Sequence, residues 1–391
     1  MLNPQVGVLA GTFFYVTTMM ICTIILPLRM SALGFSPLEI GTVVAITAIT
    51  SALGHLVGGV LCDRYGGHRM LLLSYIVITA AALGLMISTS FGNIILSMIL
   101  RGGASGIFWP ATLVYASLIN PAKSSFILGR HASMVAVGSL LGVLGGGYTA
   151  QYFGYITSFG IAAAIGFFAF ITGLLLPDLA SGKEIVRQNI KTVFQNILAL
   201  YFANKALTLA FCSAFIAAIP IAFIGSFYPL YFTSLGFAAG VVGLLSGMLH
   251  IGSFFMGLVF GKLYNHLGPY RTFVIGLVTL GASLILMKFA AVLIPLLLVM
   301  LLQGLAMSMV MVLRTIIIIS HTSTEERGSG VGIMELGFSA SLILMPVLTA
   351  TFIESMPTEN AFLLWGVVLV ALVSLLRPLF NWAGVPLFNE R

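Results

Sequence analysis

The sequence predicts an all-α membrane protein with twelve transmembrane helices in two six-helix repeats. Three observations predict this fold: an apolar composition, the spacing of long apolar segments, and a similarity between the two halves. Of the 391 residues, 60% are hydrophobic and only 7% are charged, whereas a soluble domain carries about 25% charged residues. Because so few charges could not cover a surface in water, the apolar excess must face lipid.

The long apolar segments set the number of helices. A helix needs about 20 mainly apolar residues to span a bilayer. Twelve segments qualify, at residues 6–28, 38–61, 70–89, 93–118, 131–151, 157–176, 207–231, 238–261, 272–289, 291–316, 329–352 and 361–380. The second opens with Ser36-Pro37-Leu38-Glu39, a pattern typical of a capped helix start, with Ser36 at the N-cap and Glu39 completing a capping box.

A polar stretch between the sixth and seventh segments divides the chain. We expect an N-terminal bundle over residues 1–176, a cytoplasmic linker over 177–205 and a C-terminal bundle over 206–391. The linker is predicted to carry an amphipathic helix that lies on the membrane surface.

The basic residues predict the orientation. With the N-terminus inside, Arg29 and Lys288 alone face outside, and Arg101 and Arg314 lie within segments. The inside connections hold Arg64, Arg69, Lys123, Arg130, Lys183, Arg187, Lys191, Lys205, Lys262, Arg271, Arg327, Arg377 and Arg391. Such a bias follows the positive-inside rule. We therefore expect a multi-pass protein of the cell membrane with both termini cytoplasmic, and the net charge of +7 needs no nucleic acid.

The two halves resemble each other at a constant shift of 202 residues (236 − 34). Matched pairs include Pro27 and Pro229, Gly34 and Gly236, Gly66 and Gly268, and Arg69 and Arg271. Glycines alone would not also align prolines and arginines. Parallel six-helix repeats are a known plan of transporters.

The segment from Gly59 to Arg69 reads GVLCDRYGGHR. It resembles the loop signature of the major facilitator superfamily, G-x-x-x-D-R-x-G-x-[RK]-[RK], with His68 at the first basic position. Gly59 would let a neighbouring helix approach closely, and Gly66 would permit a tight reversal. The second copy replaces the acidic residue by Asn265.

This resemblance implies a conformational latch between the halves, formed by Gly59, Asp63, Arg64, Gly66 and Arg69. It implies that Asp63 meets the N-terminus of the eleventh helix, where the macrodipole favours an anion, and Asp63 is also a candidate for proton coupling. The alternative is a basic loop that only sets topology.

The fifth segment contains glycines at helical spacing. Gly138, Gly142, Gly146 and Gly147 resemble the signature g-x-x-x-G-P-x-x-G-G of the drug:proton antiporters, the exporter group of the superfamily that the chain is most like, with Val143 in place of the proline. Glycines one turn apart also form a smooth surface for close helix packing. Both interpretations remain open.

Arg101 and Glu335 are charged residues inside predicted helices that are candidates for function. Placing the charge of Arg101 within the membrane costs several kcal/mol, so its side chain should face the bundle interior, a cavity or a partner. It resembles the family's fourth-helix pattern R-x-x-q-G and could bind an anionic substrate group; a structural ion pair or snorkelling is the alternative. Glu335 is the candidate proton carrier, because burial favours the protonated form of a carboxyl group. A salt bridge to Arg314, or to the latch arginines Arg64 and Arg69, is its alternative.

In the superfamily, helices 1, 4, 7 and 10 line the central cavity. The resemblance therefore implies a substrate-binding site made by Arg101 with Tyr15, Trp109, Tyr228 and Gln303. Aromatic side chains suit an adaptable apolar pocket.

The predicted function is secondary active transport by alternating access, namely proton-coupled efflux of a hydrophobic or amphipathic small molecule. A proton-coupled uptake symporter and a lipid flippase of the same fold are the alternatives. No G-x-x-x-x-G-K-[ST] occurs, which argues against an ATP-driven pump, and scattered ionisable residues argue against an enzyme. The expected partners are a small-molecule substrate, protons and membrane lipids, with no cofactor, no metal and no nucleic acid, and the protein is expected to be a monomer.

Overall fold

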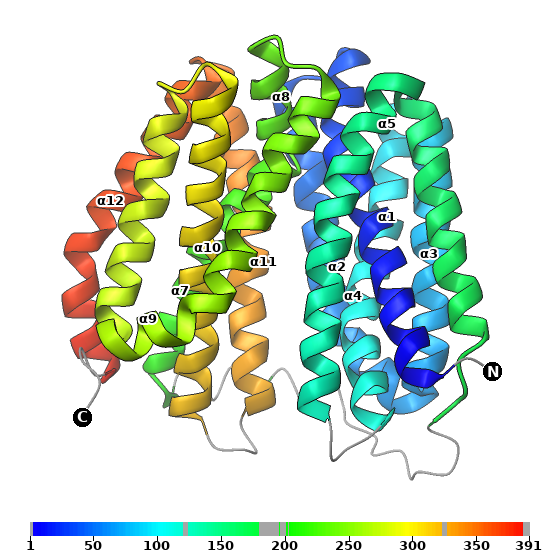
Figure 1. The fold of residues 1–391 in the computed structure, drawn as a ribbon, viewed down its shortest axis with the longest axis horizontal. Coiled ribbons are helices and arrows are strands. Elements are labelled where there is room, and N and C mark those ends of the chain that lie inside the picture. Colours follow the sequence, from blue (N-terminus) through cyan, green and yellow to red (C-terminus); the bar gives the residue numbers. More distant parts are fainter. Residues whose placement is uncertain are drawn as a thin grey trace. The chain divides into compact units, whose positions relative to one another are not determined.

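The computed structural model describes residues 3–119, 124–179, 195, 201, 203–322 and 327–385, although not every side chain within them. Over these residues every regular element is an α-helix (Figure 1). The helices are α1 (Pro4–Ala32), α2 (Pro37–Tyr65), α3 (Gly67–Ile87), α4 (Phe91–Ile119), α5 (Ser124–Leu174), α7 (Ala206–Ile224), α8 (Phe227–Ser234), α9 (Ala239–Met287), α10 (Leu293–His321), α11 (Arg327–Ile353) and α12 (Thr358–Ala383).

Ten helices in the described residues are long and apolar enough to cross a membrane. Two of these ten elements, α5 and α9, each contain two helices. The backbone of α5 leaves the helical region at Gly154 (φ 78°), and that of α9 leaves it at Gly268 (φ 74°). Because a glycine tolerates positive φ, each long element is two spans joined by a sharp bend. The prediction of an all-α fold with twelve spans is confirmed.

The seventh span is interrupted, whereas the sequence predicted one helix over residues 207–231. In the structure α7 ends at Ile224, and α8 begins at Phe227. Pro229 has no N–H, so a continuous helix would leave the Gly225 carbonyl without its usual partner. Pro229 therefore weakens the helix at Gly225, but it does not by itself explain the break, because its repeat equivalent Pro27 lies inside the continuous helix α1.

The start of α2 is capped as predicted. The Ser36 N–H donates to Glu39 Oε2 at 2.8 Å, and the Glu39 N–H donates to Ser36 Oγ at 3.3 Å. Pro37 occupies the first turn. This capping box satisfies two backbone donors that would otherwise lack partners.

The chain divides into two compact units. The first comprises Met1–Ile190 and Gly236–Gly247, and the second comprises Lys191–Leu235 and Met248–Arg391. In the first unit α1 packs along α5, α2 packs along α4, and α3 packs against both α4 and α5. In the second, α7 packs against α10 and α11. The predicted linker helix lies largely outside the described residues.

The repeat between the halves extends to backbone geometry. The φ angles are 86° at Gly34 and 88° at Gly236, and they are 87° at Gly66 and 74° at Gly268. Helix crossings match as well. A side chain at Gly102 in α4 would meet the carbonyl oxygen of Thr47 in α2, and one at Gly304 in α10 would meet that of Leu249 in α9. Both members of this second pair lie 202 residues further along (304 − 102 and 249 − 47).

Arg29 departs from the charge bias, and the structure gives its local role. Its guanidinium donates to the Leu85 carbonyl and, at 2.7 Å, to the Ser88 carbonyl, at the end of α3. It lies 5.5 Å from the Phe159 ring centroid. A cation at a helix C-terminus is stabilised by the unpaired carbonyls and the macrodipole. The residue therefore caps a helix.

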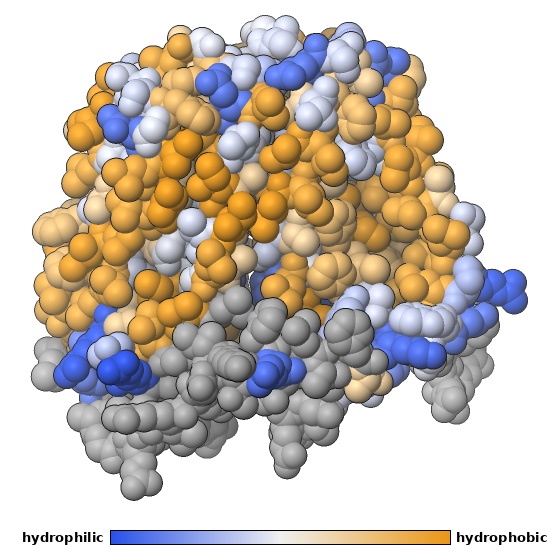
Figure 2. Space-filling model, turned by 180° about the vertical axis from the view of Figure 1, so that it is seen from behind, coloured by the Kyte–Doolittle hydropathy of each residue, from blue (hydrophilic) through white to orange (hydrophobic). Residues whose placement is uncertain are grey.

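The helices expose large apolar side chains along their lengths. Leu53, Phe168, Leu258 and Leu298 are each more than half exposed. Figure 2 shows apolar side chains gathered across the middle of the visible face, with hydrophilic residues toward the helix ends. This is the surface that lipid tails cover in a membrane protein.

Candidate functional site

The charge of Arg101 connects two helices of the first unit. α4 carries the residue in a membrane span, and its Nη2 donates to the Met19 carbonyl of α1 at 3.1 Å and to the Thr23 hydroxyl. Thr23 in turn donates to the same carbonyl at 2.8 Å. The buried Nε has no hydrogen-bond partner among the described residues. Arg101 is thus held in place by neutral groups and keeps a donor to spare.

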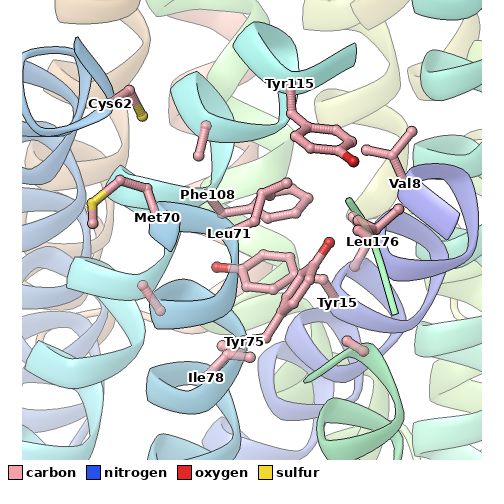
Figure 3. Close-up of a cluster of buried hydrophobic side chains, with 14 residues drawn as sticks. Val8, Tyr15, Cys62, Met70, Leu71, Tyr75, Ile78, Phe108, Tyr115 and Leu176 are labelled. Carbon is pink, nitrogen blue, oxygen red and sulfur yellow. The ribbon is translucent and has the colours of Figure 1, made fainter. Parts of the chain in front are cut away.

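Aromatic residues from three helices surround the next turns. Tyr15 of α1 stacks on Phe108 of α4, with ring centroids 3.7 Å apart and planes 10° from parallel. Tyr75 of α3 lies against both rings, with centroids 6.1 and 6.2 Å away. Figure 3 shows these three side chains pointing toward one another. Tyr15 is fully buried, so in this conformation it has no surface that a substrate could touch.

A buried polar chain lies near Trp109 that sequence reasoning missed. His131 of α5 meets the Trp109 ring edge-on, with centroids 6.4 Å apart. Its Nε2 is 3.3 Å from Thr112 Oγ1, which is 3.4 Å from Thr12 Oγ1 of α1. His131 stands at the first position of a predicted span, where a histidine is easily taken for a helix end. Only the fold brings it to the two threonines.

The second unit pairs two predicted substrate residues with each other. The Tyr228 hydroxyl of α8 donates to Gln303 Oε1 of α10 at 2.8 Å. Gln303 Nε2 donates to Ser283 Oγ of α9 at 3.3 Å. Tyr228 and Gln303 are both fully buried. Their polar groups therefore satisfy one another inside the helix bundle, and neither lines an open surface in this conformation.

Glu335 of α11 lies opposite Arg314 of α10. Its Oε1 is 3.9 Å from Arg314 Nη2, and the side chains are 37% and 9% exposed, respectively. Arg314 also lies over the Phe338 ring at 5.3 Å. The guanidinium Nε and Nη1 are buried without hydrogen-bond partners among the described residues. The contact is long for an ion pair, so Arg314 is a buried cation that its carboxylate neighbour only partly compensates.

The latch segment closes the turn between α2 and α3. Gly66 takes φ 87° there, as a tight reversal requires. His68, at the family's first basic position, is 3.0 Å from the Gly173 carbonyl through Nε2. Arg64 and Arg69 are exposed, and Arg64 lies over the Tyr65 ring at 5.2 Å. The side chain of Asp63 is outside the described residues.

The expected close approach at Gly59 is not seen among the described residues. A side chain at Gly59 would find nothing within 4 Å there, so the role of Gly59 stays a prediction. The close approach lies one residue earlier: a Cβ at Gly58 would be 2.7 Å from the Gly106 carbonyl oxygen. A shift of one residue moves a position by about 100° around a helix, so Gly58 faces α4 and Gly59 does not.

The α5 glycines pack mainly on α1. A Cβ would be 3.0 Å from the Phe13 carbonyl oxygen at Gly138, 2.6 Å from Met20 Cβ at Gly142, and 2.8 Å from Ile24 Cγ2 at Gly146. At Gly147 it would meet the backbone of Gly243 within the first unit, 2.9 Å from its Cα. At least three of the four predicted motif residues therefore form a packing surface for α1.

Twelve apolar spans in two matched halves, with only a few charged residues inside the spans, define a polytopic membrane transporter fold. The sequence profile of the Major Facilitator Superfamily matches residues 8–223 and 210–381. The chain belongs to this superfamily, and it is therefore a membrane transporter.

Curated relatives are similar over about two thirds of the chain. The multi-drug resistance efflux pump PmrA of Streptococcus pneumoniae serotype 4 is 25% identical over 280 residues, 68% of this chain and 68% of that protein. The multidrug resistance protein MdtG of Klebsiella pneumoniae is 25% identical over 272 residues, 67% of this chain and 64% of that protein.

Solved transporter structures share the fold. The nucleoside transporter NupG superposes with a TM-score of 0.83 at 15% sequence identity, covering 97% of this chain and 100% of that one. A bacterial homologue of the human lysosomal transporter Spinster gives a TM-score of 0.77 at 13% identity, with coverages of 97% and 96%. At these identities the likeness concerns the fold alone.

Proposed function

We propose that this chain exports small, partly hydrophobic molecules across the cell membrane in exchange for protons. Similarity to a protein named as a multi-drug resistance efflux pump supports the direction, and similarity to a second named as a multidrug resistance protein supports the substrate class. In this proposal the halves 1–176 and 206–391 alternate access, both termini are cytoplasmic, and the segment from Gly59 to Arg69 acts as a latch between them.

The contact of Glu335 with Arg314 carries the proposal of proton coupling. A carboxyl group and a guanidinium face each other at 3.9 Å inside adjacent membrane spans. Ionisable groups are costly there and usually mark ion or proton pathways. When Glu335 is ionised it compensates Arg314; when it takes up a proton, Arg314 loses that partner. Proton binding would thereby change the charge balance between α10 and α11, which is what a coupled conformational change requires.

Arg101 is the proposed substrate contact. Its fixed charge lies among neutral hydrogen-bond acceptors, and its Nε is buried without a partner among the described residues. In this proposal Nε binds an acceptor group on a substrate when the helices around it open during alternating access. Trp109, half-buried about two turns further along α4, would supply apolar contact to another part of the substrate. Tyr15, Tyr228 and Gln303 would act by holding the surrounding helices, because they are fully buried.

Transport by purified protein in liposomes tests this function. A fluorescent amphipathic dye that is neutral or anionic, and so can accept a hydrogen bond from Arg101, is loaded. Its movement is followed with and without an imposed pH gradient. We expect the gradient to drive the wild-type flux and to have no effect on Glu335→Gln. Glu354→Gln, an exposed carboxylate beyond the end of the same helix, serves as the matched control and should behave as wild type. Equal wild-type flux with and without the gradient would refute proton coupling.

A further inference from the structure

An apolar groove lies within the second unit between α7, α9 and α12. It encloses about 460 Å³ and is lined by side chains that include Phe211, Phe215, Phe273, Leu375, Leu376 and Leu379. Phe273 is fully buried and forms part of the floor, whereas Leu375 is 57% exposed at the rim. The groove is therefore open along one side. It runs from Leu372 to Leu379, about 10 Å along α12 at the helical rise per residue.

α12 faces the surroundings more than any other described span. Only 22% of its central apolar stretch is buried, the lowest share among the ten spans of the described residues. Val367, Leu375 and Trp382 are each about half exposed along it. Because such a helix must be covered by lipid tails in a membrane, the open side of the groove is accessible to an acyl chain.

A cation and an indole stand at one end of the groove. The Nζ atom of Lys205, just before α7, lies 5.4 Å from the ring centroid of Trp382 in the last turn of α12. Trp382 follows the groove residues Pro378 and Leu379 by four and three positions, so it continues the same helix face. Tryptophan at a span end is typical of the interface between headgroups and tails, and lysine there attracts anionic headgroups.

We propose that this groove binds one acyl chain of an anionic phospholipid, whose phosphate contacts Lys205 and whose glycerol region lies against Trp382. The apolar lining recognises the chain, and the lysine at its end selects the charge of the headgroup. The separation of these two features along the helix axis matches the amphipathic order of a phospholipid, with its charge at one end and its tail directed into the membrane.

Quenching of Trp382 fluorescence by brominated lipids tests this site. Trp109→Phe and Trp365→Phe leave Trp382 as the single tryptophan of the 391-residue chain, which has three. The protein is placed in bilayers that contain increasing fractions of brominated phosphatidylglycerol or brominated phosphatidylcholine. We expect half-maximal quenching by the phosphatidylglycerol at a fraction at least about fivefold lower than by the phosphatidylcholine, as an added ionic contact of about 1 kcal/mol predicts.

Two further variants in this background locate the contact. Lys205→Gln should abolish the preference for phosphatidylglycerol, while Lys288→Gln, an exposed lysine elsewhere in the second unit, should retain it. Cys212→Phe places a larger side chain in the groove and should reduce quenching by both lipids. Equal quenching by the two lipids before any lysine is changed would overturn the headgroup assignment. No quenching by either lipid would show that a segment of this chain or a second copy covers the groove, and would overturn the site.

Discussion

The two halves place different chemistry at the same position of the repeat. Arg101 in α4 and Gln303 in α10 are 202 residues apart (303 − 101). Arg101 reaches across to α1 and keeps a donor without a partner among the described residues, whereas Gln303 is satisfied by Tyr228 and Ser283. The helix crossings beside them match, at Gly102 on Thr47 and Gly304 on Leu249. The helix packing is therefore the same in both halves, whereas the polar residues at the equivalent positions 101 and 303 differ.

A second pair shows the same separation of scaffold and chemistry. Arg29 donates to the Leu85 carbonyl, and the Tyr231 hydroxyl donates to the Met287 carbonyl at 2.8 Å. Both donors and both acceptors are related by the shift of 202 residues. A guanidinium and a phenol therefore cap equivalent helix ends, which accounts for the lone arginine on the predicted outer side.

A third comparison concerns two polar contacts between neighbouring helices, one in each half. Thr112 and His131 meet between α4 and α5, and Arg314 and Glu335 meet between α10 and α11. Arg314 is the repeat equivalent of Thr112 (314 − 112 = 202). The first contact is neutral and buried, while the second places a carboxylate against a cation. In the proposed function, substrate binding belongs to Arg101 of the first half, and proton coupling belongs to Glu335 of the second.

Replacing Arg101 should have the largest effect on this comparison. Arg101→Gln makes the first half resemble the second, and it removes a charged donor worth about 1.5–3 kcal/mol. Substrate affinity should fall about 10- to 100-fold, measured by equilibrium binding to purified protein. Gln303→Leu is the counterpart: it should retain affinity while lowering stability, because the Tyr228 hydroxyl loses its acceptor. Similar losses of affinity in both variants would mean that the halves share the site.

Two glycines of α5, three residues apart, test whether this glycine-rich segment is needed for helix packing. Gly142→Ala brings a methyl group 2.6 Å from Met20 Cβ, whereas Gly145→Ala points into open space. Overpacking should lower the free energy of unfolding by about 1–3 kcal/mol in the first variant. The second should be unchanged or slightly stabilised, as helix propensity favours alanine. Denaturant titration in detergent measures both, and an equal response would show that α1 does not rest on this glycine face.

The equivalent turns of the two halves should respond equally. Gly66→Ala and Gly268→Ala each force a side chain into positive φ, which costs about 1–2 kcal/mol. Gly59→Ala, without a described neighbour, should keep its stability and instead lower the transport rate if Gly59 belongs to the latch. Thermal unfolding together with transport assays distinguishes these outcomes. A stability loss at only one of the two turns would break the structural equivalence.

The smallest effect is expected at the capped helix ends. Tyr231→Phe removes one hydrogen bond and should lower the free energy of unfolding by about 1 kcal/mol. Arg29→Met removes two charge-assisted bonds at the equivalent place and should cost somewhat more. Hydrogen exchange at the ends of α3 and α9 reports the local loosening. If exchange rises elsewhere in the unit and not at these ends, the capping assignment is wrong.

The sequence was sufficient to predict the fold because lipid imposes length, apolarity and charge bias on every span. The start of α2 was predictable too, since a capping box is local. The break after Ile224 was not predicted, because Pro229 weakens the helix without by itself breaking it. A close approach was expected at Gly59 and is seen at Gly58 among the described residues, because a motif match does not give helix rotation. The contacts from His131 to Thr112 and from Thr112 to Thr12 join three helices, and no local sequence pattern contains them.

The proposal that Arg101 binds substrate and Glu335 couples transport to protons is tested most directly by comparing two transport modes in one liposome preparation. Exchange of labelled for unlabelled substrate requires binding and alternating access, whereas uphill movement also requires the proton. We predict that Glu335→Gln retains exchange and loses pH-driven movement, while Arg101→Gln loses both. If Glu335→Gln still drives substrate uphill with a pH gradient, or if Arg101→Gln exchanges substrate at the wild-type rate, the assignment of the two sites is contradicted.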